Sequence, residues 1–271
     1  MKEALLRIGP GYYHPDRVQI TLSHRIKQYN IIGQLGRAGK SSKPSKALFS
    51  NPHVAKDSSE GIRNTFVDVK ASKAYTGGTK DAGHSAVIDS KGHIWLTGCD
   101  RWQQLGLGAS TNGASGYTWE RLWQESFQRN DFLLDFIKSK SGKTSSDNST
   151  LIRDVAIGGD HTLVLASNQK DVYSFGKGAE GQLGIVTKPF VSCPTLAKEL
   201  SIKESDDRKI GAVCAIRHCS FTLDEGGHVM KRSGKCRLDK DWIKNAIQDC
   251  IESAAVDGLL PKRDEQNSNE Q

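Results

Sequence analysis

Short apolar stretches alternate with polar, glycine-rich turns through the middle of the chain. Ala86-Val87-Ile88 is followed by a polar turn and then by Ile94-Trp95-Leu96. Leu163-Val164-Leu165 is followed in the same way by a polar turn and by residues 172–175, which include Tyr173 and Phe175. Runs of β-branched and aromatic residues this short, bounded by glycine and polar residues, predict antiparallel strands joined by hairpins.

These two units align with each other along their whole length. His84 to Gly106 spans 22 residues and His161 to Gly184 spans 23. The phrase Gly-Gln-Leu-Gly ends the second unit and also occupies residues 33–36, while residues 103–106 read Gln-Gln-Leu-Gly. A degraded third unit begins at His218 and reaches Gly234. Such recurrence predicts repeated supersecondary units, whose repeated residues are His84, Gly92, Trp95, Gly98 and Gly106 in the first and His161, Tyr173, Gly176, Gly181 and Gly184 in the second.

The combination of these motifs resembles the regulator of chromosome condensation repeat family, over about residues 61–236. The resemblance implies an all-β fold, a β-propeller of four-stranded antiparallel blades, usually seven of them. At roughly 50 residues a blade, 271 residues are too few for a full ring. We therefore expect an incomplete propeller or one with divergent blades. Three explanations stay open: a truncated gene model, blades that have diverged, or completion by a partner on the exposed sheet edges.

The pattern divides the chain into three parts. Residues 1–60 form a basic N-terminal arm with one repeat fragment, in which His14 lies 22 residues before Gly36. Residues 61–236 form the repeat region, with an insertion at 109–150. Residues 237–271 form an amphipathic helix and a polar tail. Asp239 or Asp241 can cap that helix, and Gly258 can end it. Its apolar face docks on the propeller or takes a partner helix, and the residues after Pro261 read as disordered.

The insertion is the part of the repeat region that favours partner binding. Its apolar residues Trp119, Leu122, Trp123 and Phe127 are spaced like one face of a short helix. Tryptophan and arginine dominate interface energetics, so the partner-binding candidates are Trp119, Arg121, Trp123, Phe127 and Arg129. The alternative is that these side chains pack the insertion onto its own blade. The Ser- and Lys-rich residues 138–150 read as a mobile loop.

Charge is concentrated at the N-terminus. Residues 1–50 hold nine Lys and Arg against two Asp and Glu, while the remaining residues hold 29 of each. A basic nucleic-acid-binding face on the propeller is therefore not expected, and any such contact would use the arm. The arm is either a solvated basic tail or an organellar transit peptide. We expect no secretory leader, and the sequence has no apolar run of 18 residues. We therefore expect an intracellular, unsecreted protein, in the cytoplasm or nucleus rather than the mitochondrion.

Several motifs suggest chemistry that their context does not support. Residues 176–181 satisfy G-x-G-x-x-G, but Pro189 and Pro194 follow where a dinucleotide site needs a helix. Gly142-Lys143-Thr144 and Gly39-Lys40-Ser41 lack the upstream glycine of a phosphate-binding loop. Equivalent repeat histidines lie a blade apart, and each is expected to hydrogen-bond within its own blade. We expect no catalytic residues, no cofactor and no metal.

The six cysteines show no paired spacing, and without a secretion signal we expect reduced, mostly buried thiols. Cys214, His218 and Cys219 lie close in sequence but lack the second clustered pair that a zinc site needs.

The sequence thus favours a non-enzymatic propeller that binds a protein partner as a scaffold. The resemblance also implies an alternative, a guanine-nucleotide exchange factor whose partner is a small GTPase. A second alternative, an organellar (mitochondrial) assembly or RNA-associated factor, depends only on the basic N-terminal arm.

Overall fold

The computed structural model describes residues 6–8, 47, 49–50, 67–78, 83–108, 123–141, 151–186 and 189–261. Residues 14, 33–36, 119 and 121, which the sequence analysis singles out, lie outside this part of the chain. The elements within it, in chain order, are β1 (Leu6–Ile8), β2 (Ala71–Gly77), β3 (His84–Asp89), β4 (Ile94–Cys99), β5 (Trp123–Arg129), α1 (Asp131–Ser141), β6 (Ile152–Ile157), β7 (His161–Ala166), β8 (Val172–Lys177), β9 (Phe190–Leu196), β10 (Ile210–Ile216), β11 (Cys219–Asp224), β12 (Val229–Ser233) and α2 (Lys240–Val256).

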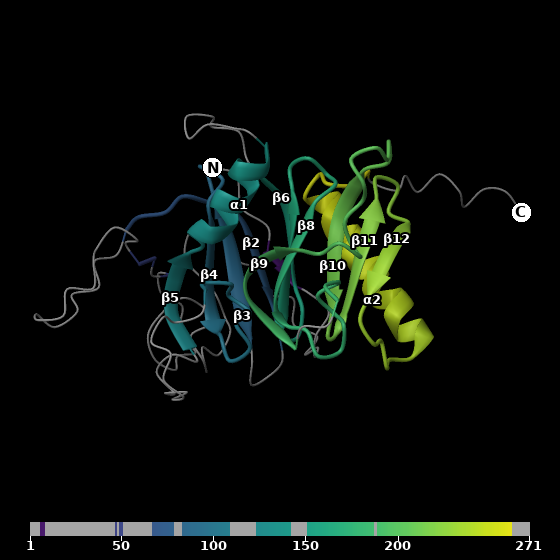
Figure 1. The fold of residues 1–271 in the computed structure, drawn as a ribbon, viewed down its shortest axis with the longest axis horizontal. Helices are drawn as coiled ribbons and strands as arrows, with labels where there is room; N and C mark the ends of the chain where they lie inside the picture. The colour runs from purple at the N-terminus through teal and green to yellow at the C-terminus, as the bar shows by residue number, and fades with distance from the viewer. Residues whose placement is uncertain are drawn as a thin grey trace, which may run out of the picture.

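Each sequence repeat forms one sheet, and the three sheets stand side by side (Figure 1). The first blade is β2–β5, with β1 added in parallel to β2. The second blade is β6–β9 and the third is β10–β12. Neighbouring strands within each blade are antiparallel. The predicted all-β architecture of antiparallel propeller blades, without a closed ring in the described residues, is confirmed.

Local hydrogen bonding explains why the repeats turn where they do. Asp89 Oδ1 accepts from the backbone N–H groups of Lys91 and His93, at 2.8 and 2.9 Å. Asp224 Oδ1 accepts from Gly226 and His228 in the same way. A short side chain with an acceptor oxygen, placed at the first residue of the turn, satisfies backbone N–H groups that the hairpin leaves unpaired.

This match between the two turns corrects the sequence alignment of the third unit. Asp89 and Asp224 are equivalent, and His84 and Cys219 each lie five residues earlier, at the start of β3 and β11. The third blade therefore has Cys219, and not His218, at the repeat histidine position. His218 lies six residues before Asp224, one residue too early for that position.

Aliphatic and aromatic side chains fill the space between the blades. Between the first and second blades the largest fully buried groups include Tyr75, Leu96, Leu105 and Phe175, joined by Leu133 of α1. A second cluster, between the second and third blades, contains Leu163, Leu165, Val172, Ile210 and Val213. Gly106 closes the Gln-Leu-Gly phrase at φ +62°, where an added Cβ would lie 2.7 Å from the Phe175 ring. The phrase therefore ends in glycine because the next blade's core packs directly against it.

Both outer faces of this stack are covered. On the first blade, Phe49 stacks on Phe127 with ring centroids 4.7 Å apart and meets Trp95 edge-on at 5.4 Å. On the third blade, α2 buries Ala246, Ile251 and Ala254. The prediction that this helix docks on the propeller is confirmed. Asp239 is its cap, because the carboxylate accepts from the backbone N–H groups of residues 241 and 242.

The predicted helix across the insertion is wrong for residues 123–129, which form β5. A spacing of four residues returns a side chain to the same face of a helix, but four is also an even number and returns it to the same face of a strand. Pairing with β4, with Trp95 opposite Arg129 and Cys99 opposite Trp123, selects the strand. The helix α1 follows instead, so residues 138–141 end a helix and are not loop. The three-part domain division stays a prediction.

Candidate protein-binding face

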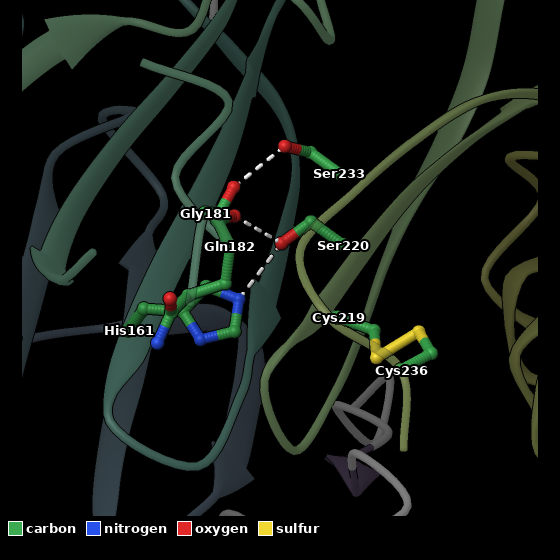
Figure 2. The surroundings of a disulfide bond; sticks show 7 residues. All are labelled: His161, Gly181, Gln182, Cys219, Ser220, Ser233 and Cys236. Atoms are coloured by element: carbon green, nitrogen blue, oxygen red, sulfur yellow. Dashed lines mark hydrogen bonds between the residues drawn. A yellow bond between two sulfur atoms is a disulfide. The ribbon is translucent and has the colours of Figure 1, made fainter. Parts of the chain in front are cut away.

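A buried hydrogen-bond relay joins each blade to the next. His161 Nε2 lies 2.8 Å from Ser220 Oγ, and Ser220 Oγ donates to the backbone oxygen of Gln182 at 2.6 Å (Figure 2). The same arrangement links His84 to Thr162 at 2.9 Å, and Thr162 donates to the backbone oxygen of Gln104 at 2.8 Å. The expectation that each histidine bonds within its own blade is wrong. The side chain stands on the sheet face that meets the neighbouring blade, so its partner comes from there.

The hydrogen bonds of the relay determine the tautomer of each histidine. Because the serine hydroxyl proton goes to the Gln182 carbonyl, His161 Nε2 must donate to the hydroxyl oxygen. Complete burial, with smaller contributions from His84 and His218, lowers the pKa of His161 to about 3. The imidazole is therefore neutral at physiological pH.

A serine beside a histidine can be a nucleophile with its base, but this pair cannot act as one. A general base needs a pKa near the working pH and access to substrate. His161 and Ser220 are both fully buried, and the hydroxyl proton points away from the imidazole to a backbone carbonyl. The relay is a structural bond between blades.

The relay also shapes a surface at one edge of the stack. Gln104 and Gln182 belong to the turns that follow β4 and β8, and their side-chain oxygens accept from the N–H groups of Trp102 and Glu180, at 2.8 and 2.9 Å. Ser233 donates to the Gly181 oxygen and so ties the third blade to the second at the same level (Figure 2). We call this edge the turn face. It comprises the turns that follow β4, β8 and β12, those that precede β7 and β11, and the first turn of α2, where Trp242 lies beside Arg217.

Two partly exposed tryptophans stand on the turn face, each beside a cation. Trp102 is 37% exposed, and its ring centroid lies 4.8 Å from Lys177 Nζ of the second blade. Lys177 Nζ is 3.7 Å from Asp160 Oδ2, which holds it near the ring. At the other end, Trp242 of α2 is 36% exposed, and the Arg217 guanidinium lies 5.8 Å from its centroid. A cation over an indole face is attracted by the ring quadrupole.

The partner-binding candidates from the sequence are placed differently from these residues. Trp123 is half-buried opposite Cys99. Phe127 is buried in the aromatic cluster on the first blade. Arg129 Nε donates to Asp131 at 2.6 Å, at the start of α1. The structure does not bring these three together on one exposed surface. Phe127 instead packs the insertion onto its own blade, which is the alternative to partner binding. Their partner binding stays a prediction, as it does for Trp119 and Arg121.

Sequence reasoning missed both turn-face tryptophans. Trp102 lies two residues before Gln104, at a position where the second repeat has Glu180, so a large apolar residue there breaks the repeat pattern. That departure is the signal that could have found it. Trp242 lies in the first turn of α2, where its side chain is 36% exposed.

The expectation of reduced cysteines is also wrong for four of the six. The structure pairs Cys214 with Cys250 and Cys219 with Cys236, with Cα atoms 6.1 and 5.5 Å apart. These pairs are separated by 36 and 17 residues, so only the fold brings them together. Cys99 and Cys193 are free, and burial raises the pKa of the Cys99 thiol to about 11. Among the described residues, no group of three or more possible ligands could hold a metal ion.

Comparisons with known proteins identify the repeats. The model of the regulator of chromosome condensation (RCC1) repeat matches residues 152–182, and a second model of the same repeat matches residues 171–221. Human Protein RCC2 is 32% identical over 167 residues, which cover 61% of this chain and 31% of that protein. The Xenopus laevis homolog is 29% identical over the same shares. The chain spans about a third of the length of these curated relatives.

Two solved structures superpose on this chain with TM-scores below 0.5. Human WBSCR16 aligns with a TM-score of 0.46 at 22% identity, over 72% of this chain and 39% of that one. Yeast RCC1 (Prp20), solved bound to Kap60, aligns with a TM-score of 0.44 at 19% identity, over 65% and 33%. Neither helix in the described part of the chain is long and apolar enough to cross a membrane.

Proposed function

The chain carries regulator of chromosome condensation repeats, and on that premise we propose that it is a non-enzymatic module that binds a protein partner through its turn face. The observation that carries the proposal is the pair of partly exposed tryptophans, Trp102 and Trp242, each set beside a cation on one edge of the stack. Tryptophan and arginine are enriched among the residues that supply most binding energy at protein interfaces.

The rest of the repeat architecture supports a binding role for loops. The strand faces are used in stacking blade on blade, and both outer faces of the stack are covered. The buried polar side chains of the repeats join blades to each other. Side chains that remain for a partner lie at the ends of the strands, where a rigid scaffold usually presents its binding residues. We place the protein inside the cell, in the cytoplasm or nucleus.

Site-specific photo-crosslinking tests the proposed face. A photoreactive phenylalanine analogue replaces Trp102 in one variant, Trp242 in a second and Val229 in a third; Val229 is 46% exposed and starts β12 at the opposite edge of the stack. We expect one and the same protein to crosslink at position 102 and at position 242, and not at 229. Equal crosslinking at 229, or none at 102 and 242 in the folded protein, would reject the turn face.

Exchange-factor activity is the second candidate, and it rests on the family resemblance. An exchange factor performs no covalent chemistry; it binds the nucleotide-free GTPase more tightly than the loaded form and so shifts the population toward release. The assay is release of a fluorescent GDP from a small GTPase with and without the protein. Acceleration that Trp102→Ala and Trp242→Ala abolish would assign exchange to the turn face, while crosslinking without acceleration supports the scaffold.

The organellar or RNA-associated alternative depends on the N-terminal arm, which lies outside the described residues. A reporter fused to residues 1–50 that stays in the cytosol would remove its support.

A further inference from the structure

The third blade replaces the interblade relay with covalent bonds. Cys219 stands at the position of His84 and His161, whose side chains reach the following blade. At this position in the third blade, Cys219 is bonded to Cys236, in the turn after β12 (Figure 2). Cys236 lies two residues after Gly234, as Asp100 lies two residues after Gly98. The disulfide therefore closes the third blade on itself at the site where the others bind a neighbour.

The helix α2 lies where a following blade would lie. Cys219 belongs to a buried cluster with Cys214, Ile216 and Phe221 of the third blade and Ala246 of α2. Cys250 of α2 is bonded to Cys214 of β10, in the same cluster. One disulfide thus ties the helix to the sheet, and the other closes the turn beside it.

Without these bonds the helix is held by little apolar surface. Its buried positions are Ala246, Ile251 and Ala254, two of them alanines, and Ile243 and Ile247 pack against the third blade while only partly buried. Loss of so few side chains to water is a small cost compared with the burial that holds the blades together. Removing the Cys214–Cys250 bond would leave α2 attached to the third blade by these apolar contacts alone.

We propose that α2 is a redox-controlled cover of the third blade, closed when the Cys214–Cys250 disulfide is formed and open when it is reduced. In the intracellular location proposed above, on which this step rests, disulfides are commonly transient and redox-sensing. Opening exposes the apolar face of β10 and β11, including Cys214, Ile216 and Phe221. This proposal is independent of the turn face.

The chemistry is thiol–disulfide exchange with a dithiol reductant. A thiolate of the reductant attacks one sulfur of a protein disulfide and forms a mixed disulfide, and the second thiolate of the reductant resolves it. Each protein disulfide gains two electrons and two protons and becomes two thiols, while the reductant becomes a disulfide. Cys250 and Cys236 are only partly buried, whereas Cys214 and Cys219 are fully buried. The attack therefore falls on Cys250 and Cys236, and the buried partners leave.

Hydrogen-exchange mass spectrometry on the full chain tests the cover. Dithiothreitol should accelerate exchange of α2 amides roughly 30- to 1000-fold, the range that corresponds to loss of a typical disulfide, while amides of the second blade stay slow. Cys250→Ser removes only the bond to the helix and should exchange fast in α2 with or without reductant. Cys236→Ser, the matched control, removes only the turn bond and should keep α2 slow until reductant is added.

Thiol counting tests the starting state. Alkylation of the unfolded, oxidised protein with N-ethylmaleimide should add two groups, at Cys99 and Cys193, and six after reduction. Six additions without reduction overturn the proposal. So does α2 exchange that is unchanged by dithiothreitol or by Cys250→Ser. Reduction that accelerates amide exchange in the second blade together with α2 also overturns it, because the whole protein would then be unfolding.

Discussion

Substitution of Ser220 by alanine tests the interblade relay directly. The change removes the hydrogen bond from His161 Nε2 at 2.8 Å and the bond to the Gln182 carbonyl at 2.6 Å. Ser220, His161 and Gln182 are fully buried, so water does not replace the lost partner. A buried donor and a buried acceptor left unsatisfied cost about 1–3 kcal/mol each. We therefore expect Ser220→Ala to lower the free energy of unfolding by about 2–5 kcal/mol.

The third blade supplies a matched control two residues away. Thr222 is also fully buried in β11, but its hydroxyl has no hydrogen-bond partner in the described structure. Thr222→Val removes a hydroxyl of the same kind and keeps the shape of the side chain, so it should be neutral or stabilising. Urea unfolding followed by tryptophan fluorescence measures both variants. At roughly 2–4 °C per kcal/mol, Ser220→Ala should also lower Tm by about 4–20 °C. Equal stability of the two variants would refute the relay.

Two further predictions concern Asp100, in the turn after β4, and Gly176 of β8, which lies close to Asp160 and His161 of the same blade. Burial raises the pKa of Asp100 to about 7, so the folded protein retains a proton that the unfolded chain releases above about pH 4. The wild type therefore loses stability as pH rises from 4 to 7. Asp100→Asn, which still accepts from Leu105 N–H, should be more stable than the wild type by up to about 4 kcal/mol at pH 8 and equally stable near pH 4. Urea unfolding midpoints measured over a pH series check this, and a gain in stability that is independent of pH contradicts it. Gly176→Ala puts a Cβ 2.5 Å from the Asp160 oxygen and 2.8 Å from His161 Cα, at φ +105°, and should cost at least about 3 kcal/mol. Gly258→Ala, at φ +70° with nothing within 4 Å, should cost about 1 kcal/mol; thermal melts compare them, and similar Tm values would contradict the steric argument.

Local patterns were sufficient to find the blades. A polar turn between two apolar runs predicted the hairpin of β3 and β4, and a second such turn predicted the hairpin of β7 and β8. All four strands are present at the expected residues. His84 pairs with Gly98 and His161 pairs with Gly176, as their equivalent positions in the two repeats predict. The sequence pattern failed at β5, because the spacing of Trp123 and Phe127 fits a helix face and a strand face equally well.

The partners of the repeat histidines lie 59 and 78 residues away, so no local pattern contains them. The same is true of Cys214 and Cys250, whose sulfurs meet only after α2 folds back on β10.

What the sequence determined by itself is the repeating unit: strands set by apolar runs, turns set by aspartate and glycine, and the helix start set by Asp239. These features depend on residues a few positions apart, whose interactions are the same in any surroundings. Tertiary structure decided what each blade does to the next: which hydroxyl a histidine meets, which cysteines join, and which tryptophans remain exposed at the turn face. Burial against a distant segment fixes those outcomes, and only the folded chain brings that segment near.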